Sequence, residues 1–276
     1  MSWMIRCLTL SLLMGCVSCV FTPWGTNVPD SYRDLNKKNI EKIATQNRPD
    51  SDGIKFIVIS DPQGSPLTVR ALIKKINARP DVDDFAFITV LGDFTNQGLQ
   101  MEYQMMIESL LTSDLPFLGI VGNHDLISKG KTLYTETFGE MNFSFAAGGV
   151  KFIAYNDNRL EMPEVPDYRW LAGQLEGDSN RLATVVMAHT PWLETTDTDE
   201  RTAIKQLFQS FGVDLAIFGH VHEGGFFETF GMKMVEVGQL SASNLNYAVV
   251  QITNDRQVVI ERCDYECHSV TYQSQD

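Results

Sequence analysis

The stretch FAFITVLGDFTNQG, residues 85–98, joins a largely apolar run to a polar turn that contains two glycines. A run of this length, rich in aromatic and β-branched residues, is typical of a strand buried on both faces of its sheet. Similar apolar runs occupy residues 56–59, 117–121, 185–188 and 215–218, and β-rich segments lie near residues 151–155, 233–237, 248–252 and 258–261.

Helical patterns alternate with these runs. Apolar residues recur at i, i+3, i+4 and i+7, which is the spacing of one face of a helix. The three sets are Val69, Leu72, Ile73 and Ile76; Tyr103, Met106, Ile107 and Leu110; and Ile204, Leu207, Phe208 and Phe211. The alternation of strands and helices predicts an α/β domain with two packed sheets and outer helices.

Polar clusters follow five of the predicted strands directly. They are Asp61-Pro62-Gln63, residues 92–98, Gly122-Asn123-His124-Asp125, His189-Thr190-Pro191 and Gly219-His220-Val221-His222, and they contain four of the five histidines. Taken alone, each cluster has the composition of an ordinary loop after a strand. Ligands of open α/β sheets bind beyond the carboxyl ends of strands, so five such clusters are expected to converge. Their Asp, Asn and His side chains suit two divalent ions better than one structural zinc.

The ordered series Asp-x-Gln, Gly-Asp-x4-Gly, Gly-Asn-His-Asp, His and Gly-His-x-His resembles the calcineurin-like metallophosphoesterase superfamily. The resemblance covers nearly everything from Ile54 to about Glu261. It implies a four-layer αββα sandwich with two mixed β-sheets and a dinuclear metal site at the strand ends. It also implies a phosphoesterase, which would act on a phosphomonoester or phosphodiester.

The resemblance carries over to individual positions. One metal would be bound by Asp61, Gln63 and His222, the other by Asn123, His189 and His220, and Asp93 would bridge both. His124 would face the scissile group and stabilise the transition state or protonate the leaving oxygen. Two divalent ions (Mn, Fe, Zn or Mg) would share a water, lower its pKa to near neutral and direct the resulting hydroxide at phosphorus.

Departures from the superfamily patterns bear on activity. Gln63 replaces the usual histidine of the first motif, and an amide oxygen is a weaker donor to zinc, which favours Mn or Mg. The arginine of the protein-phosphatase motif Gly-Asp-x-x-Asp-Arg-Gly is absent. Asn96, through its amide oxygen, and Asp125 are the candidates to orient His124.

Two other functions stay open at this point. The first is a catalytically weak or inactive binding lipoprotein of the same fold, an alternative motivated by Gln63. The second is a metal-dependent hydrolase of non-phosphate bonds, which would use the same ions on a neutral substrate. Asn156, Asp157, Asn158, Trp192 and residues 223–225 either shape the substrate pocket or serve as loop and packing residues.

The net charge limits the partners. The 276 residues include 22 Lys and Arg against 35 Asp and Glu, a formal charge of −13. A chain this acidic is repelled by phosphate backbones, which argues against general nucleic-acid binding and against basic tethering to anionic lipid. An anionic substrate therefore needs a local positive charge, which the two metals would provide. The oligomeric state is not predicted.

The first residues indicate export. Residues 1–15 have one positive charge followed by a short apolar run, as in a signal peptide. Leu13-Met14-Gly15-Cys16 resembles the lipobox of bacterial lipoproteins, so a lipid anchor at Cys16 is expected, in the periplasm or cell envelope. Secretion with cleavage nearby is the alternative. We expect a polar tether over residues 16–53 with one short helix near 35–43, a catalytic domain over 54–262 and a tail over 263–276.

Three cysteines beyond Cys16 would persist in an oxidising compartment. Cys263 and Cys267 stand four residues apart, a separation that a disulfide can bridge in a turn or helix but not along a strand. They are either structural or idle. The sequence contains no CxxC pair, so it gives no indication of a structural zinc site.

Overall fold

The structure, a computed structural model, describes residues 24–46, 48–49, 52–177, 181–192, 198–229 and 231–274. The predicted signal peptide and Cys16 lie outside these residues. Within them, no helix has the length and apolar character needed to cross a bilayer.

Two mixed sheets form the centre of the described chain. The first has the order β14 (Cys267–Ser269), β13 (Val258–Cys263), β12 (Tyr247–Ile252), β1 (Ile54–Ile59), β2 (Phe85–Val90) and β3 (Phe117–Gly119). The second has the order β15 (Gln273–Ser274), β8 (Gly225–Thr229), β9 (Met232–Glu236), β7 (Leu215–Phe218), β6 (Ala183–Met187), β5 (Val150–Ala154) and β4 (Phe143–Ala147). β1, β2 and β3 are parallel to one another, as are β5, β6, β7 and β9. β10 (Leu240–Ser241) and β11 (Asn244–Leu245) form a separate two-stranded sheet next to the end of β1, where the Leu240 backbone donates to Ser60 at 2.9 Å.

The sheets pack face to face because alternate side chains of each strand point to opposite sides. Phe56 of β1 stacks on Phe87 of β2 and meets Phe152 of β5 edge-on, with ring centroids 5.0 and 5.4 Å apart. The intervening residue Ile57 belongs instead to the layer beneath the helices. The space between the sheets is therefore a dry core of its own.

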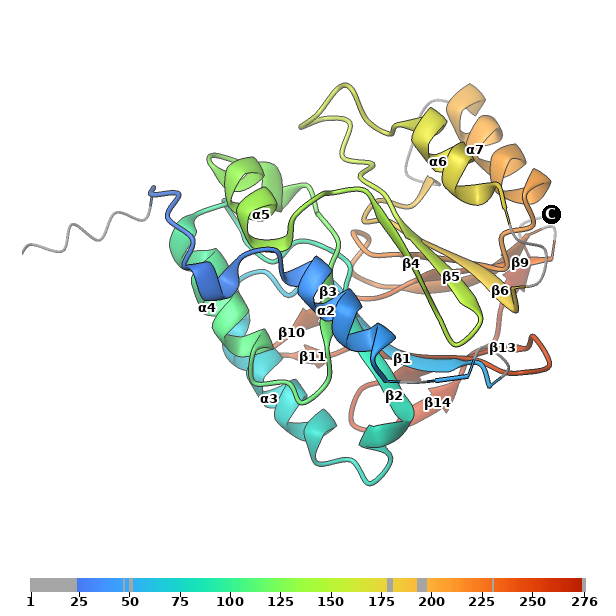
Figure 1. The fold of residues 1–276 in the computed structure, drawn as a ribbon, viewed down its shortest axis with the longest axis horizontal. Coiled ribbons are helices and arrows are strands. Elements are labelled where there is room, and N and C mark those ends of the chain that lie inside the picture. The colour runs from blue at the N-terminus through green and yellow to red at the C-terminus, as the bar shows by residue number, and fades with distance from the viewer. Residues whose placement is uncertain are drawn as a thin grey trace, which may run out of the picture.

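Helices cover both outer faces, on opposite sides of the sheets (Figure 1). α3 (Pro66–Asn77), α4 (Gln100–Leu110) and α5 (Gly130–Phe138) pack on the first sheet. α6 (Tyr168–Leu175) and α7 (Thr198–Ser210) pack on the second. The predicted apolar stripes form the buried faces of α3 and α4. On α7, Ile204 and Phe208 are buried, Leu207 is half-buried, and Phe211 follows the end of the helix. The four-layer αββα sandwich is confirmed.

The predicted tether is wrong for much of its length. The helix expected near residues 35–43 exists as α2 (Leu35–Ala44), but it packs on the domain, with Leu35 and Ile43 buried. The side-chain amide of Asn36 exchanges two hydrogen bonds of 2.8 Å with the backbone of Gly119, and Asn39 donates to Phe117 at 2.7 Å. β3 is the edge strand of its sheet, so these amides replace a missing neighbouring strand.

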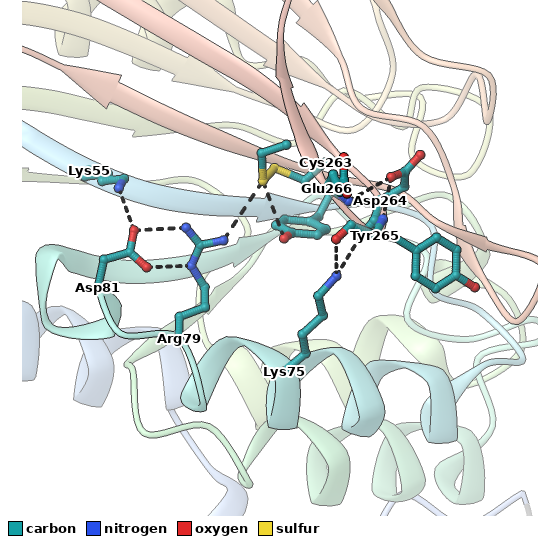
Figure 2. Close-up of a disulfide and its surroundings, with 10 residues drawn as sticks. Lys55, Lys75, Arg79, Asp81, Cys263, Asp264, Tyr265 and Glu266 are labelled. Carbon is teal, nitrogen blue, oxygen red and sulfur yellow. Dashed lines mark hydrogen bonds and ion pairs between the residues drawn. A yellow bond between two sulfur atoms is a disulfide. The ribbon is translucent and has the colours of Figure 1, made fainter.

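The predicted tail is also part of the fold. β14 pairs with β13 in the first sheet, while β15 pairs with β8 in the second, so the last residues connect both sheets. A disulfide joins Cys263 to Cys267 across the turn between β13 and β14 (Figure 2). Lys75 of α3 donates to the carbonyls of Asp264 and Tyr265 at 3.0 and 2.9 Å. The turn is thereby held against the helix layer.

Candidate metal centre and active site

The polar clusters converge at one end of the two sheets. Asp61 follows β1, Asp93 follows β2 and His189 follows β6. Ligand atoms of these three buried residues all lie within 4.8 Å of one another, although they come from different sheets. The convergence predicted from the strand ends is thus present in the structure.

Two groups of side chains meet around Asp93. His189 Nε2 lies 3.5 Å from Asp93 Oδ2, 3.1 Å from Asn123 Oδ1 and 3.3 Å from His220 Nδ1. These are the residues expected at the second metal. In the other group, His222 Nε2 lies 3.5 Å from Asp61 Oδ1.

Gln63, the unusual residue of the first motif, adjoins both aspartates. In the orientation that satisfies its neighbours, its amide nitrogen donates to the main-chain oxygens of Asp61 at 2.8 Å and Asp93 at 3.2 Å. The amide oxygen is therefore turned away from these two acceptors. This leaves the oxygen as the atom of Gln63 that can serve as a ligand.

The backbone at the site takes conformations that few residues tolerate. Asp61, Asp93, His220 and His222 have φ angles of 52°, 55°, 69° and 59°, in the left-handed region. Asp and His enter this region more readily than most residues, and such geometry clusters at functional sites. Gly122 explains part of the motif pattern, because a Cβ there would lie 2.2 Å from the backbone nitrogen of Asp93.

The carboxylate of Asp61 shows that the residues fit a metal ion. Asp61 is fully buried, and its Oδ2 accepts hydrogen bonds from Ser60 Oγ at 2.5 Å and from the His220 backbone at 2.9 Å. Its Oδ1 accepts none from the described residues. A buried carboxylate oxygen that accepts no hydrogen bond is costly. A cation between Asp61 and His222 would remove that cost.

The electrostatics of the centre favour positive charge. Burial disfavours the charged form of His189, but Asp93 and Asp61 outweigh it and raise the pKa of His189 to about 10. Burial opposes ionisation of Asp93 as well, yet His189 and His124 lower its pKa below the ordinary value. The two buried aspartates therefore create a negative potential at the centre that favours a bound cation.

His124 is held differently from the prediction. Its backbone nitrogen donates to Asp93 Oδ1 at 3.0 Å, and its Nδ1 lies 2.9 Å from the main-chain oxygen of Asn96. Because a carbonyl can only accept, Nδ1 carries the hydrogen and Nε2 is left for chemistry. The Asn96 amide oxygen is therefore not the orienting group. A main-chain partner has no signature in the sequence.

Asp125, the other candidate orienter, has a structural role instead. Its carboxylate accepts hydrogen bonds from the backbone of Gly122 at 3.0 Å, and from the backbone and hydroxyl of Thr95 at 3.1 and 3.2 Å. These bonds tie the loop after β2 to the loop after β3. Asp125 thus fixes the distance between Asp93 and Asn123 without touching the His124 ring.

A cavity of about 550 Å³ lies beside the second group of ligands. Asn123 and His220 form its boundary with the metal centre. Asp157, Asn158 and Trp192 line it, which agrees with the first of the two roles considered for them, that of shaping a pocket. Asn156 instead supports the wall, since its Oδ1 accepts from Asn158 Nδ2 at 2.8 Å. Other lining residues stand outside every motif and were missed: Arg159, Glu161 and Glu200. Residues 223–225 do not line this cavity.

Comparisons with known proteins agree with this geometry. A sequence model of the family described as calcineurin-like phosphoesterase matches residues 54–224. The mouse protein named serine/threonine-protein phosphatase CPPED1 is 26% identical over 221 residues, which are 67% of this chain and 69% of that protein. Purple acid phosphatase PPD1 from yellow lupin (Lupinus luteus) superposes with a TM-score of 0.60 at 14% identity, over 80% of this chain and 54% of that one. GAP50, described as the anchor in the inner membrane complex of Plasmodium, gives a TM-score of 0.58 at 14% identity, over 80% and 90%.

Proposed function

Because this chain belongs to the calcineurin-like phosphoesterase family and is a phosphoesterase hydrolase, we propose that it hydrolyses a phosphomonoester or phosphodiester with two bound divalent ions. The observation that carries the proposal is the buried Asp61 Oδ1. It accepts no hydrogen bond within the described chain and lies 3.5 Å from His222, at the centre where Asp93 and His189 also meet.

The proposed ligands follow the two groups in the structure. One ion would be held by Asp61, Gln63 and His222. The other ion would be held by Asn123, His189 and His220, and Asp93 would contact both ions. When bound, the two ions lower the pKa of a shared water to near neutral, supply the attacking hydroxide and neutralise charge on the phosphoryl oxygens. The amide oxygen of Gln63 favours Mn or Mg at the first position.

The remaining residues orient the reacting groups. His189 Nδ1 donates to the carbonyl of Leu91 at 2.6 Å, which directs Nε2 towards Asn123 and Asp93. The backbone of His124 holds Asp93 Oδ1 in place. With Nδ1 bound to the Asn96 carbonyl, the His124 ring can donate a proton from Nε2 to the leaving oxygen. His124 is thus the proposed general acid.

The second motif differs from that of the protein phosphatases. The relative from mouse is named a serine/threonine-protein phosphatase, but the arginine of the protein-phosphatase motif is absent here, where Asn96 and Gln97 stand. Candidate substrates are nucleotides, cyclic nucleotides, and phospholipid or envelope headgroups. A membrane anchor would favour the headgroups.

The proposed location is the cell envelope, with the chain anchored by lipid at Cys16. The disulfide between Cys263 and Cys267 supports an oxidising compartment.

The first described residues contact the domain near the active site. The carbonyl of Asn27 accepts a hydrogen bond of 2.8 Å from Gln100, just after the loop that carries Asp93. Eight residues from Cys16 to Trp24 span at most about 30 Å, so the anchor would keep the active site close to the membrane. Replacement of Cys16 by serine should abolish lipid labelling; retained labelling contradicts the anchor.

Two chromogenic esters test the activity. We expect hydrolysis of p-nitrophenyl phosphate or bis-p-nitrophenyl phosphate that depends on added Mn or Zn, and the ratio of the two rates distinguishes a monoesterase from a diesterase. Turnover of a neutral ester that inorganic phosphate does not inhibit would indicate a hydrolase of non-phosphate bonds. A folded protein that turns over neither ester with any metal would support the binding lipoprotein.

A further inference from the structure

The cavity beside the metal centre is placed to bind the leaving group of a substrate. Asn123 and His220, two of the proposed ligands, form its inner boundary, and Trp192 contributes to its wall. A phosphoryl group held by the metals would therefore have its organic substituent in this cavity. A volume of about 550 Å³ is typical of sites for small molecules.

Carboxyl groups outnumber cationic groups in the wall, and burial raises the pKa of one of them, Asp157, to about 7. Asp157, Glu161 and Glu200 line the cavity with a single cationic side chain, Arg159. Arg159 Nη1 lies 2.5 Å from Glu200 Oε2, and its Nε donates to the carbonyl of Val165 at 3.3 Å. No ion pair joins Asp157 or Glu161 to a lysine or arginine in the part of the chain described. The cavity thus disfavours a second anionic group and favours a cation.

Two acceptor oxygens in the same wall lack donors. Asp157 Oδ2 accepts from the Thr190 backbone at 2.9 Å, but its Oδ1 is buried and accepts no hydrogen bond from any described residue. The same holds for Oδ1 of Asn158, a residue only 3% exposed. A flip of the Asn158 side-chain amide, which would exchange its oxygen and nitrogen, is disfavoured because the nitrogen already donates to Val121 at 3.1 Å and to Asn156 at 2.8 Å. An N–H or O–H donor on a bound molecule would remove the cost of leaving these two oxygens unpaired.

We propose that the cavity binds an alcohol that carries a primary ammonium group, so that the substrate is the phosphoester of an amino alcohol or amino sugar. The ammonium would donate to Asp157 and Asn158 and lie within the field of Glu161. In the reaction, water forms a new P–O bond, the P–O bond to the alcohol breaks, and the alcohol leaves with a proton. The inference rests on the proposed phosphoesterase function and specifies its substrate.

Matched pairs that differ only in the amine test the proposal. Glucosamine 6-phosphate is compared with glucose 6-phosphate, and O-phosphoethanolamine with ethyl phosphate, in metal-loaded protein. A hydrogen bond between charged partners changes binding by about 10- to 100-fold, and we expect a preference of that size for the amine in kcat/KM. Phosphocholine, whose quaternary amine has no N–H, should lose most of the advantage.

Two variants locate the preference. Glu161→Gln should reduce the ratio within each pair several-fold, because it removes one charge from the wall. Glu266→Gln, a matched change in the exposed turn between β13 and β14, should leave the ratio as it is. Dissociation constants of the two sugar phosphates, measured by calorimetry with metal-loaded His124→Ala, supply the same ratio without turnover.

The outcomes separate the two proposals. Hydrolysis of the chromogenic esters with no preference inside either pair would overturn the amine site and leave the phosphoesterase standing. An amine preference in the dissociation constants of a protein that hydrolyses nothing would support the site and contradict the activity. Equal dissociation constants for the two sugar phosphates would overturn the amine site in either case.

Discussion

The Nδ1 atom of His124 lies 2.9 Å from the main-chain oxygen of Asn96. Any residue at position 96 offers that carbonyl, so the orientation of His124 does not depend on the asparagine side chain. His124→Ala should lower kcat by about 10²- to 10⁴-fold, the usual contribution of a general acid. Asn96→Ala should stay within a small factor of the wild type. Steady-state kinetics check both, and an equal loss in the two variants would assign the orientation to the amide.

Asp125 should prove important for stability. Its buried carboxylate accepts three hydrogen bonds from Gly122 and Thr95, and Asp125→Ala leaves the two backbone N–H groups among these donors without that partner. We expect the free energy of unfolding to fall by about 3 kcal/mol, measured by denaturant titration. Burial raises the pKa of Asp125 well above its usual range, so the neutral Asp125→Asn should lose less. An unchanged midpoint for Asp125→Ala would contradict this role.

Metal binding should stabilise the protein through Asp61. Ligand at a hundredfold excess over its Kd adds about 2.7 kcal/mol to the free energy of unfolding, so Mn²⁺ should raise the melting temperature. Asp61→Asn replaces the unpartnered carboxylate oxygen and should remove most of that rise. Asp114→Asn, a change of an exposed aspartate outside the site, serves as the control. An equal Mn²⁺ effect in the two variants would show that Asp61 is not a ligand.

Acid should weaken the contact between β1 and the segment that follows α3. Arg79 donates to Asp81 at 2.8 and 2.9 Å and Lys55 at 3.0 Å, and these bonds hold the pKa of Asp81 well below its usual range. The unfolded chain then takes up a proton near pH 4 that the folded chain does not. The stabilisation from Asp81 is present above that pH and is lost as the pH falls further.

Asp81→Asn checks this sign. At pH 7 the variant should lose about 1 kcal/mol of unfolding free energy, since the pair is partly exposed to solvent. Between pH 5 and 3 its stability should fall less steeply than that of the wild type, because the titrating group is gone. Parallel curves over that range would mean that another carboxylate governs the acid limb.

The sequence revealed most of the fold because the strands and helices of the sandwich are strongly patterned. Phe56 and Val58 face the core between the sheets while Ile57 faces the helices, and the stripe on α3 matches its buried side. The convergence of the proposed metal ligands was predictable for a related reason: each follows the end of a strand, where parallel strands must converge. At these positions the spacing of apolar residues along the chain agrees with the side that each strand or helix buries in the fold.

Other features had no such signal. Asn36 and Asn39 are typical of a loop or linker by composition, yet their amides complete the edge of β3. β15 has two residues, too few to show a period. Every residue type has the main-chain carbonyl that Asn96 offers to His124, so the sequence does not mark it. The acidic residues of the cavity come from two distant segments, α7 and the loop after β5. Contacts that use the backbone, or that join distant segments, become visible only in three dimensions.

The most direct test measures metal content and turnover on the same samples of wild type, Asp93→Asn and His124→Ala. The account predicts two metal ions per chain and metal-dependent hydrolysis of a p-nitrophenyl ester in the wild type. Asp93→Asn should lose bound metal together with turnover, because Asp93 is proposed to contact both ions. His124→Ala should keep both ions and lose only the rate, by about 10²- to 10⁴-fold. A folded wild type that holds two ions per chain and hydrolyses neither ester would contradict the account.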